Sequence, residues 1–463
     1  MRIVPTNRLL FFTGLILFPS SLLGSLFPEI CLYTYALIVL FLCLSIIDAL
    51  FSITVLRFIT VSTDDVFRLS RGQEKDLTLV ISHQGKKGRH LRMGLAFPPE
   101  LSSSSHEKTL ILQDPEALIR LLWTVTGRKQ GQYILSMCFL ESPSHAGFWA
   151  IRGTLPLHCD IRVYPDLLSE RKALGSLFLS HGMGVHARRM VGKGREFEKL
   201  REYVTGDSYE DIHWKATAKR GVPISKVFQV ERTQDIYVMI DGSRMSARNA
   251  AIFQHGRIQD EKRTDEDSQP SPFPGETILE RYITATLTTA MAAEKQGDRF
   301  GVGLFADTML GFVKSSSGKA HYNAVRDLLY TARPHRISPD FTELFTFLGT
   351  RIRKRSLLII LTSLDDPVLA ETFLKNVHIL SRRHLVMVNM LNPASARPLF
   401  STPHVTGIND IYQHLSGHTV WNNLRELEKS LGRQNTGFFL LDNSRLCVEL
   451  ISQYMDIKQR QIL

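Results

Sequence analysis

Two long apolar runs near the N-terminus constrain this chain more than any other feature. The first, LLFFTGLILFPSSLLGSLF, spans residues 9–27 and carries no charge. The second, ICLYTYALIVLFLCLSIIDALFSITVL, spans residues 30–56 and contains one acid, Asp48. A helix of about 20 apolar residues crosses the hydrocarbon core of a membrane. Both runs are long enough, and the short link between them predicts a membrane anchor of two transmembrane helices, a helical hairpin, within residues 1–60.

The charges around these runs predict how the chain is oriented in the lipid bilayer. Arg2 and Arg8 precede the first run, Arg57 follows the second, and the link contains no Lys or Arg. Basic residues favour the cytoplasmic side, which places both ends and the bulk of the chain in the cytoplasm as a multi-pass protein. The net charge of +11 has the same explanation. We expect Asp48 near the inner interface, without a role of its own.

The first apolar run has an alternative interpretation as a cleaved signal peptide, because SSLLGS offers small residues near its end. A single remaining span would still leave the C-terminal part in the cytoplasm. The chain has five cysteines and no CxxC pair, which favours a reducing compartment over a disulfide framework. No cysteine and histidine cluster has the spacing of a zinc site.

Residues 61–166 read as short strands separated by polar turns. Their apolar runs are rich in β-branched and aromatic residues, and several such strands at this spacing predict a small β-sandwich. The runs are DLTLVIS, HLRMGLAF, LIRLLWTVT, GQYILSMCFL and LPLHCDIRVYP. Trp123 lies in one of them and is interpreted as a core residue.

Residues 235–463 alternate continuous apolar strands with helical stretches. DIYVMID, RFGVGLFA, SLLIILTS, HLVMVNML and GFFLLD are the expected strands. This alternation predicts an α/β domain with a mainly parallel sheet covered on both faces. Ligands of such sheets bind at the carboxyl ends of the strands. Asp241, Asp307 and the pair Asp365–Asp366 fall at or just past these ends.

Between these parts, residues 167–234 form a linker that contains the charged motif GREFEKLREYVTGDSYEDIHWKATAKR, residues 194–220. The spacing of apolar residues in EFEKLREY predicts a short amphipathic helix, with a second helical segment from Asp211 and a strand over 223–232. We interpret the motif as a structural clasp held by paired charges. The proposed members of that network are Arg201, Glu202, Asp207 and Lys215.

The same motif argues against a nucleic-acid surface. Acids match bases almost one for one through residues 194–220, whereas a phosphate-binding surface would be strongly cationic. We therefore expect no nucleic-acid partner. His213 could serve as a general base, but no nucleophile or orienting acid is identifiable beside it, so a packed or surface histidine is the preferred interpretation.

The motif resembles that of a membrane-associated bacterial family known as domain of unknown function 58. The resemblance rests on a pattern of glycines, aromatics and charges, and on the closing YMDIK at residues 454–458. The matching residues are Gly194, Glu196, Phe197, Leu200, Arg201, Tyr203, Gly206, Asp207, Ile212, Trp214, Lys215 and Lys219. The chain departs from the pattern at Glu210, where a base is usual, and at Lys219, where Arg is usual.

The resemblance implies a von Willebrand factor A-like domain after the motif, in a protein of the bacterial inner membrane. It also implies association with a MoxR-type AAA+ ATPase and an unknown protein client, in assembly or maturation. The function expected from it is a membrane-anchored, non-catalytic protein-interaction adaptor. The alternatives are an uncharacterised metal-dependent hydrolase or nuclease that uses the motif's acids and Lys215, and a structural membrane scaffold.

Von Willebrand A domains often hold Mg²⁺ at the top of the sheet, which gives this chain a candidate metal site. Oxygen ligands from three loops in a near-octahedral array suit that ion. The candidate residues are Asp241, Ser243, Ser246, Thr342, Ser363 and Asp365. Met245 stands where a second serine belongs, and a thioether is a poor Mg²⁺ ligand. We expect a degenerate site that still offers a docking surface, and no certain cofactor.

Overall fold

A computed structural model describes most of the chain. The chain divides into two compact units, Met1–Asp166 and Leu167–Leu463. The described residues are 2–26, 31–83, 88–112, 118–167, 191–205, 208–229, 233–250, 276–399, 401 and 407–460.

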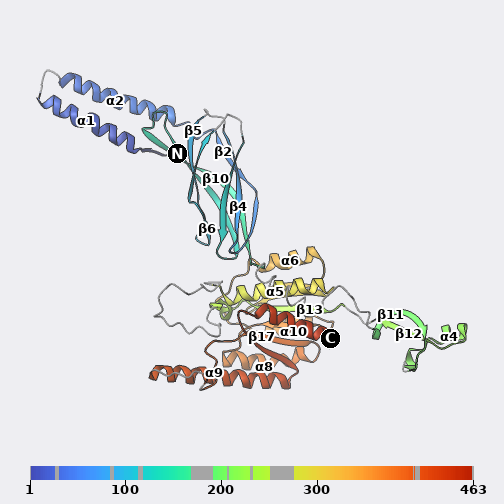
Figure 1. The fold of residues 1–463 in the computed structure, drawn as a ribbon. Coiled ribbons are helices and arrows are strands. Elements are labelled where there is room, and N and C mark those ends of the chain that lie inside the picture. Colours follow the sequence, from blue (N-terminus) through green and yellow to red (C-terminus); the bar gives the residue numbers. More distant parts are fainter. Residues whose placement is uncertain are drawn as a thin grey trace. The chain divides into compact units, whose positions relative to one another are not determined.

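Two apolar helices begin the first unit. Helix α1 (Asn7–Leu26) and helix α2 (Cys31–Ser52) lie side by side (Figure 1), and most of their large apolar side chains are exposed. Within α2, Leu32–Ser52 is long and apolar enough to cross a membrane, whereas the apolar stretch of α1, Asn7–Leu23, is shorter. One such helix near the N-terminus indicates membrane association.

The last turns of α2 are bound to the turn between strands β9 (Gly131–Pro143) and β10 (Trp149–Tyr164). Asp48 is only 8% exposed and accepts hydrogen bonds from the Ser144 hydroxyl at 2.6 Å and the Ala146 amide at 3.0 Å. The indole of Trp149 donates to the Ser45 carbonyl at 2.9 Å. The expectation that Asp48 has no role was wrong, because its carboxylate joins helix to sheet.

Two sheets in the first unit share one hydrophobic core. Along strand β4 buried residues alternate with less buried ones, as expected where one face of a strand packs inward. Trp123 is fully buried in this core, as predicted. The 6-stranded sheet contains β1 (Arg2–Pro5), β10 (Trp149–Tyr164), β9 (Gly131–Pro143), β5 (Arg89–Leu95), β7 (Glu107–Leu112) and β3 (Val66–Ser70), and the 4-stranded sheet contains β2 (Ile59–Thr63), β4 (Glu74–His83), β8 (Ile119–Gly127) and β6 (Leu101–Ser103).

The second unit is built on a 6-stranded sheet of order β15-β14-β13-β16-β17-β18. Its strands pair in parallel, except that β15 runs antiparallel to β14. The mainly parallel sheet predicted from the apolar runs is therefore present. The bounds are β13 (Asp235–Asp241), β14 (Arg299–Phe305), β15 (Met309–Ser316), β16 (Leu357–Leu361), β17 (Leu385–Leu391) and β18 (Thr436–Leu441).

Helices cover both faces of this sheet (Figure 1) and form a separate core on each. On one face lie α5 (Ile278–Lys295), α6 (Lys319–Leu329) and α10 (Leu446–Arg460). On the other lie α7 (Phe341–Arg351), α8 (Pro367–Ser381) and α9 (Ile408–Arg433). Because side chains alternate along a strand, each buried strand supplies residues to both cores, which explains its continuous apolar run.

A buried ionic cluster at the amino edge of the sheet secures the last helix. Asp298, whose side chain is 0% exposed, accepts hydrogen bonds from the Lys458 ammonium at 2.6 Å, the Tyr454 hydroxyl and the Gln234 amide at 3.0 Å. Tyr454 and Lys458 lie four residues apart on α10 and therefore share one face of the helix. The YMDIK segment thus closes the domain by holding α10 against the start of β14.

The charged motif forms a small arm of its own. Strand β11 (Val191–Glu202) pairs antiparallel with β12 (Ile224–Gln229), and between them lie the short 3₁₀ turn η2 (Tyr209–Asp211) and helix α4 (Trp214–Arg220). The predicted helix in EFEKLREY was wrong, since this segment is part of β11. Pairing with β12 satisfies its backbone groups and overrides the helical spacing. The predicted second helical segment and the following strand are present.

Candidate functional site

The carboxyl edge of the parallel sheet holds a buried polar cluster around Asp241. This residue ends β13 and is fully buried, and its carboxylate accepts from the Ser243 amide at 2.8 Å and the Thr362 hydroxyl at 2.6 Å. Burial raises the pKa of Asp241, while the hydroxyl and amide donors oppose that shift. Asp241 is therefore a buried carboxyl whose direct partners are all neutral.

The chain turns sharply after Asp241 because Gly242 allows a close approach to β14. The Gly242 amide donates to the Phe305 carbonyl at 2.7 Å, and a Cβ at Gly242 would lie only 3.1 Å from the Leu304 side chain. Ser243 then caps the short 3₁₀ turn η3 (Arg244–Ala247) by accepting from the Met245 amide. This turn directs the Arg244 side chain outward and places Met245 in the hydrophobic core.

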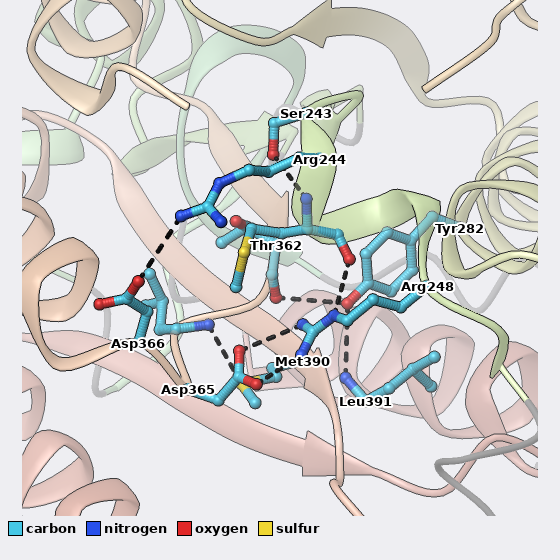
Figure 2. Close-up of polar contacts among 11 residues, drawn as sticks. Ser243, Arg244, Arg248, Tyr282, Thr362, Asp365, Asp366, Met390 and Leu391 are labelled. Carbon is cyan, nitrogen blue, oxygen red and sulfur yellow. Dashed lines mark hydrogen bonds and ion pairs between the residues drawn. The ribbon is translucent and has the colours of Figure 1, made fainter. Parts of the chain in front are cut away.

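Arg248 binds an acidic residue at the carboxyl edge of the sheet. Arg248 makes a two-pronged ion pair with Asp365, with its guanidinium nitrogens 2.5 and 3.1 Å from the two carboxylate oxygens (Figure 2). Its Nε also donates to the Met245 carbonyl at 3.0 Å, which fixes the guanidinium against the turn. Arg248 therefore brings a full positive charge to the edge where the sequence had suggested an ion.

Tyr282 of α5 closes the cluster from the other face of the sheet. Its hydroxyl donates to the Thr362 carbonyl at 3.2 Å and accepts from the Leu391 amide at 3.4 Å (Figure 2). Burial raises the pKa of this phenol, which keeps it a neutral donor. The hydroxyls of Ser246 and Ser363 are also buried, and neither has a hydrogen-bond partner among the described residues.

The rim of the cluster is accessible to solvent. Arg244, with a side chain 53% exposed, donates from Nε to the Ser338 hydroxyl at 3.0 Å and lies 3.8 Å from Asp366 (Figure 2). Asp366 in turn caps α8 by accepting from the Val368 amide at 3.0 Å. The outer surface above the buried cluster thus presents an arginine held by weak, exposed contacts.

The predicted metal ligands do not form a set that fits Mg²⁺. Asp241, Ser243, Ser246, Ser363 and Asp365 all lie at the carboxyl edge, but the Asp365 carboxylate is engaged by Arg248. Thr342 lies on α7, where its hydroxyl accepts from Asn376 of α8 at 3.2 Å. In the described part of the chain no group of three or more His, Cys, Asp or Glu residues could hold a metal ion.

One protein-family model matches two segments of this chain. A model described as "Protein of unknown function DUF58" matches residues 199–257 and 275–400. The matching family model is DUF58. No curated protein matches the chain.

Solved structures give similarities at low sequence identity. An aerotolerance-related membrane protein from Bacteroides fragilis NCTC 9343 is 11% identical with a TM-score of 0.28, over 48% of this chain and 98% of that one. The conserved hypothetical protein BatB from Bacteroides thetaiotaomicron is 13% identical with a TM-score of 0.28, over 49% of this chain and 99% of that one.

The DUF58 match begins inside β11 and therefore includes most of the arm. Several apolar side chains of the arm are exposed, with Tyr209 at 76% and Trp214 at 70%. Ile212 is buried, and the rings of Tyr203 and Tyr209 stack with centroids 5.9 Å apart. His213 accepts from the Ala216 amide at 3.0 Å, so it caps α4.

The other motif residues have different outcomes. Gly206 and Asp207 lie outside the described residues, so the charged network predicted with Asp207 stays a prediction. The structure gives backbone positions in β11 for Gly194, Glu196 and Phe197, and Leu200 is 39% exposed. Lys215 and Lys219 are exposed on α4.

Three residues of the carboxyl-edge cluster were missed by sequence reasoning, namely Arg248, Tyr282 and Thr362. Thr362 immediately follows the apolar strand β16, so its place at a strand end could have been read from the sequence. Arg248 and Tyr282 lie outside strands, and only the fold brings them to Asp365 and Thr362.

Proposed function

We propose that this chain is a membrane-anchored, non-catalytic adaptor that binds partner proteins through the carboxyl edge of its α/β unit. The observation that carries the proposal is the ion pair between Arg248 and Asp365 beside the buried Asp241. Each carboxylate of the cluster is engaged within the fold, and the accessible group above it is the Arg244 guanidinium. Such a surface suits recognition of a partner's carboxylate through hydrogen bonds and charge.

We also propose an architecture for each part of the chain. In this view α1 and α2 form a transmembrane hairpin, the two sheets of the first unit form a sandwich, and the α/β unit is von Willebrand A-like. The exposed apolar surface of both helices supports the hairpin. Arg2, Arg8 and Arg57 flank the apolar runs and support cytoplasmic placement of the remaining chain at the bacterial inner membrane.

The proposed partner is a MoxR-type AAA+ ATPase, with an unidentified protein as client. This part rests on the resemblance of the motif alone. In this scheme the adaptor holds the ATPase at the membrane through the carboxyl edge. The Arg244 rim then supplies a metal-independent contact to an acidic group of the partner, in place of the bridging cation that related domains use.

The test is affinity purification of the tagged, full-length protein from gently solubilised native membranes, with identification of the co-purifying proteins. We expect an AAA+ ATPase to co-purify with the natural protein and to be lost with Arg244→Glu. Chelation of divalent cations should not release the ATPase, because the proposed contact at Arg244 does not depend on a metal. Absence of an ATPase after crosslinking would contradict the partner, and release by chelation would contradict the metal-independent contact.

A matched control separates a local effect from a general effect of charge. Arg382→Glu reverses an exposed arginine at the C-terminal end of α8, away from the carboxyl edge of the sheet. We expect this variant to retain the partner. Thermal unfolding of both variants checks that the fold is unchanged, since reversal of an exposed charge usually alters stability by about 0.5 kcal/mol or less.

A further inference from the structure

The sheet of the α/β unit ends in a strand whose outer edge is not covered by another described strand. Strand β18 pairs with β17 on one side and is the last strand of the sheet order. Its burial differs from that of β17, and Phe439 in its middle is 38% exposed. An outer strand presents a row of backbone N–H and C=O groups that can pair with an added strand.

A groove runs along this strand between two helices. Its volume is about 840 Å³, and consecutive strand residues from Phe438 to Leu441 form its floor. One wall comes from α9, with Trp421 and Arg425, and the other comes from α10. The Arg425 guanidinium lies over the Trp421 ring at 5.4 Å, and the His418 ring stacks on the same indole at 5.6 Å, so this wall presents an aromatic ring held between two neighbours of its own helix. The groove therefore has the length and open floor that an extended peptide needs.

The α10 wall is acidic. Glu449, Ser452, Gln453 and Asp456 line it, at spacings that place them on one helix face. Neither Glu449 nor Asp456 forms an ion pair with any described residue, and burial, followed by the nearby Asp442 charge, raises the pKa of Glu449. The groove is also lined by Arg397, Arg425 and Glu428, and Arg425 pairs with Glu428. The acids therefore outnumber the bases by one, and the two acids of the α10 wall suit a basic ligand.

We propose that this groove, defined by β18, α9 and α10, binds an extended basic segment of a partner protein by strand addition to β18. The peptide backbone pairs with the outer edge of β18, and alternate side chains point to the two helices. Lys or Arg side chains on the α10 side meet Glu449 and Asp456, and apolar side chains on the α9 side contact Trp421 and Leu440. This surface is distinct from the Arg244 rim and does not depend on the ATPase.

Synthetic peptides added to the full-length protein in detergent test this proposal. The probe is a fluorescent peptide of alternating Val and Lys, and the control peptide replaces each Lys by Glu. We expect the lysine peptide to bind at least about tenfold more tightly in fluorescence anisotropy, with affinity weakened by salt. Binding should also slow hydrogen exchange of the backbone amides in residues 436–441. Equal binding of both peptides, or no binding at about 1 mM, overturns the proposal.

Variants locate the binding to the groove. Glu449→Gln with Asp456→Asn should weaken the lysine peptide about tenfold, because each partly exposed ion pair contributes up to about 1 kcal/mol. Glu426→Gln, an exposed acid on α9 that does not line the groove, should leave binding unchanged. An equal loss of peptide affinity in both variants would show non-specific electrostatic binding. Unchanged hydrogen exchange of the β18 amides would show that the peptide does not pair with this strand. Either result overturns strand addition. Self-association that blocks the peptide assigns the groove to a second copy, which also overturns it.

Discussion

Two buried aspartates at opposite edges of one sheet are stabilised in different ways. Asp298, at the amino edge, receives a direct ammonium from Lys458 as well as a phenol and an amide. Asp241, at the carboxyl edge, receives hydrogen bonds from neutral groups of Ser243 and Thr362, and the nearby cation, Arg248, is paired with Asp365 instead. A buried carboxylate with a direct counter-charge is a structural anchor, whereas one held by neutral donors retains a raised pKa.

This difference distinguishes the amino edge, which is closed by ion pairing, from the carboxyl edge, to which we assign partner binding in our proposal. The amino edge is closed by residues of the last helix, which bind Asp298 from far along the chain. The carboxyl edge has a solvent-accessible rim at Arg244 and buried hydroxyls at Ser246 and Ser363 that lack partners among the described residues. The comparison therefore predicts larger stability effects at the first edge than at the second.

The largest effect is expected from Asp298→Ala. Removal of this carboxylate leaves the Tyr454 hydroxyl without its acceptor and the Lys458 ammonium without its counter-charge, although the Gln296 carbonyl still accepts from Lys458, at a cost of about 3–5 kcal/mol in the free energy of unfolding. Asp298→Asn should cost less, because it keeps an acceptor for the Gln234 amide. Hydrogen exchange of α10 amides measures the change, and natural exchange rates in the alanine variant would show that the cluster is not an anchor.

Acid should weaken the amino edge through His384. Burial and the adjacent Arg383 charge lower the pKa of His384 from 6.5 to about 4, and they outweigh the backbone of Ile352, which favours the protonated ring. The unfolded chain therefore takes up the proton first, and the folded state loses stability as pH falls from 6.5 to about 4. The loss should reach about 1–3 kcal/mol. His384→Gln should flatten the unfolding free energy over this window, and an unchanged slope speaks against a buried neutral histidine.

The Arg248–Asp365 pair should show an intermediate effect. In a double-mutant cycle with Arg248→Ala and Asp365→Ala, we expect a coupling energy of about 1–2 kcal/mol, because the pair is partly buried and doubly hydrogen-bonded. Thermal or denaturant unfolding of the four proteins measures it. Strictly additive losses of unfolding free energy would mean that Arg248 and Asp365 do not stabilise one another. The comparison between Arg248 at this edge and Lys458 at the other edge would then no longer hold.

The smallest effect is expected from Asp241→Asn, about 1 kcal/mol or less at acidic pH, since the amide can keep both neutral contacts. The pKa of Asp241 is raised in the folded state, so the natural protein loses stability as pH rises from the unfolded pKa, 3.8, through the folded value. The variant lacks this loss and should gain relative stability with rising pH. A stability difference that stays constant with pH would place a charged, well-compensated carboxylate at the site.

The parallel sheet and the position of Asp241 could be predicted because both depend on local pattern. Continuous apolar runs mark strands that are buried on both faces, and polar residues just past them mark the carboxyl edge. The ion pair from Arg248 to Asp365 spans 117 residues, and no periodicity reports such a contact. The sequence therefore suggested Asp365 as a metal ligand, whereas the fold gives it an internal cation.

The helix predicted in EFEKLREY shows a second limit of local patterns. The spacing of its apolar residues fits an amphipathic helix. In the fold, however, the segment pairs as a strand with β12, which lies more than twenty residues later in the chain. Strand pairing depends on that distant segment, so a short charged stretch cannot reveal it. The Tyr454 and Lys458 contacts to Asp298 were hidden for the same reason, although their four-residue spacing was visible in YMDIK.

The junction at Asp48 gives the first unit a mechanical property. Because Asp48 holds the turn through Ser144 and Ala146, while Trp149 holds the Ser45 carbonyl, the end of α2 and strand β10 are joined without a flexible linker. A helix tilts when the thickness of the surrounding bilayer changes. In the proposed membrane anchor, a tilt of α2 is passed to the sheets of the first unit through these contacts, so a change in lipid thickness changes the tilt of those sheets as well.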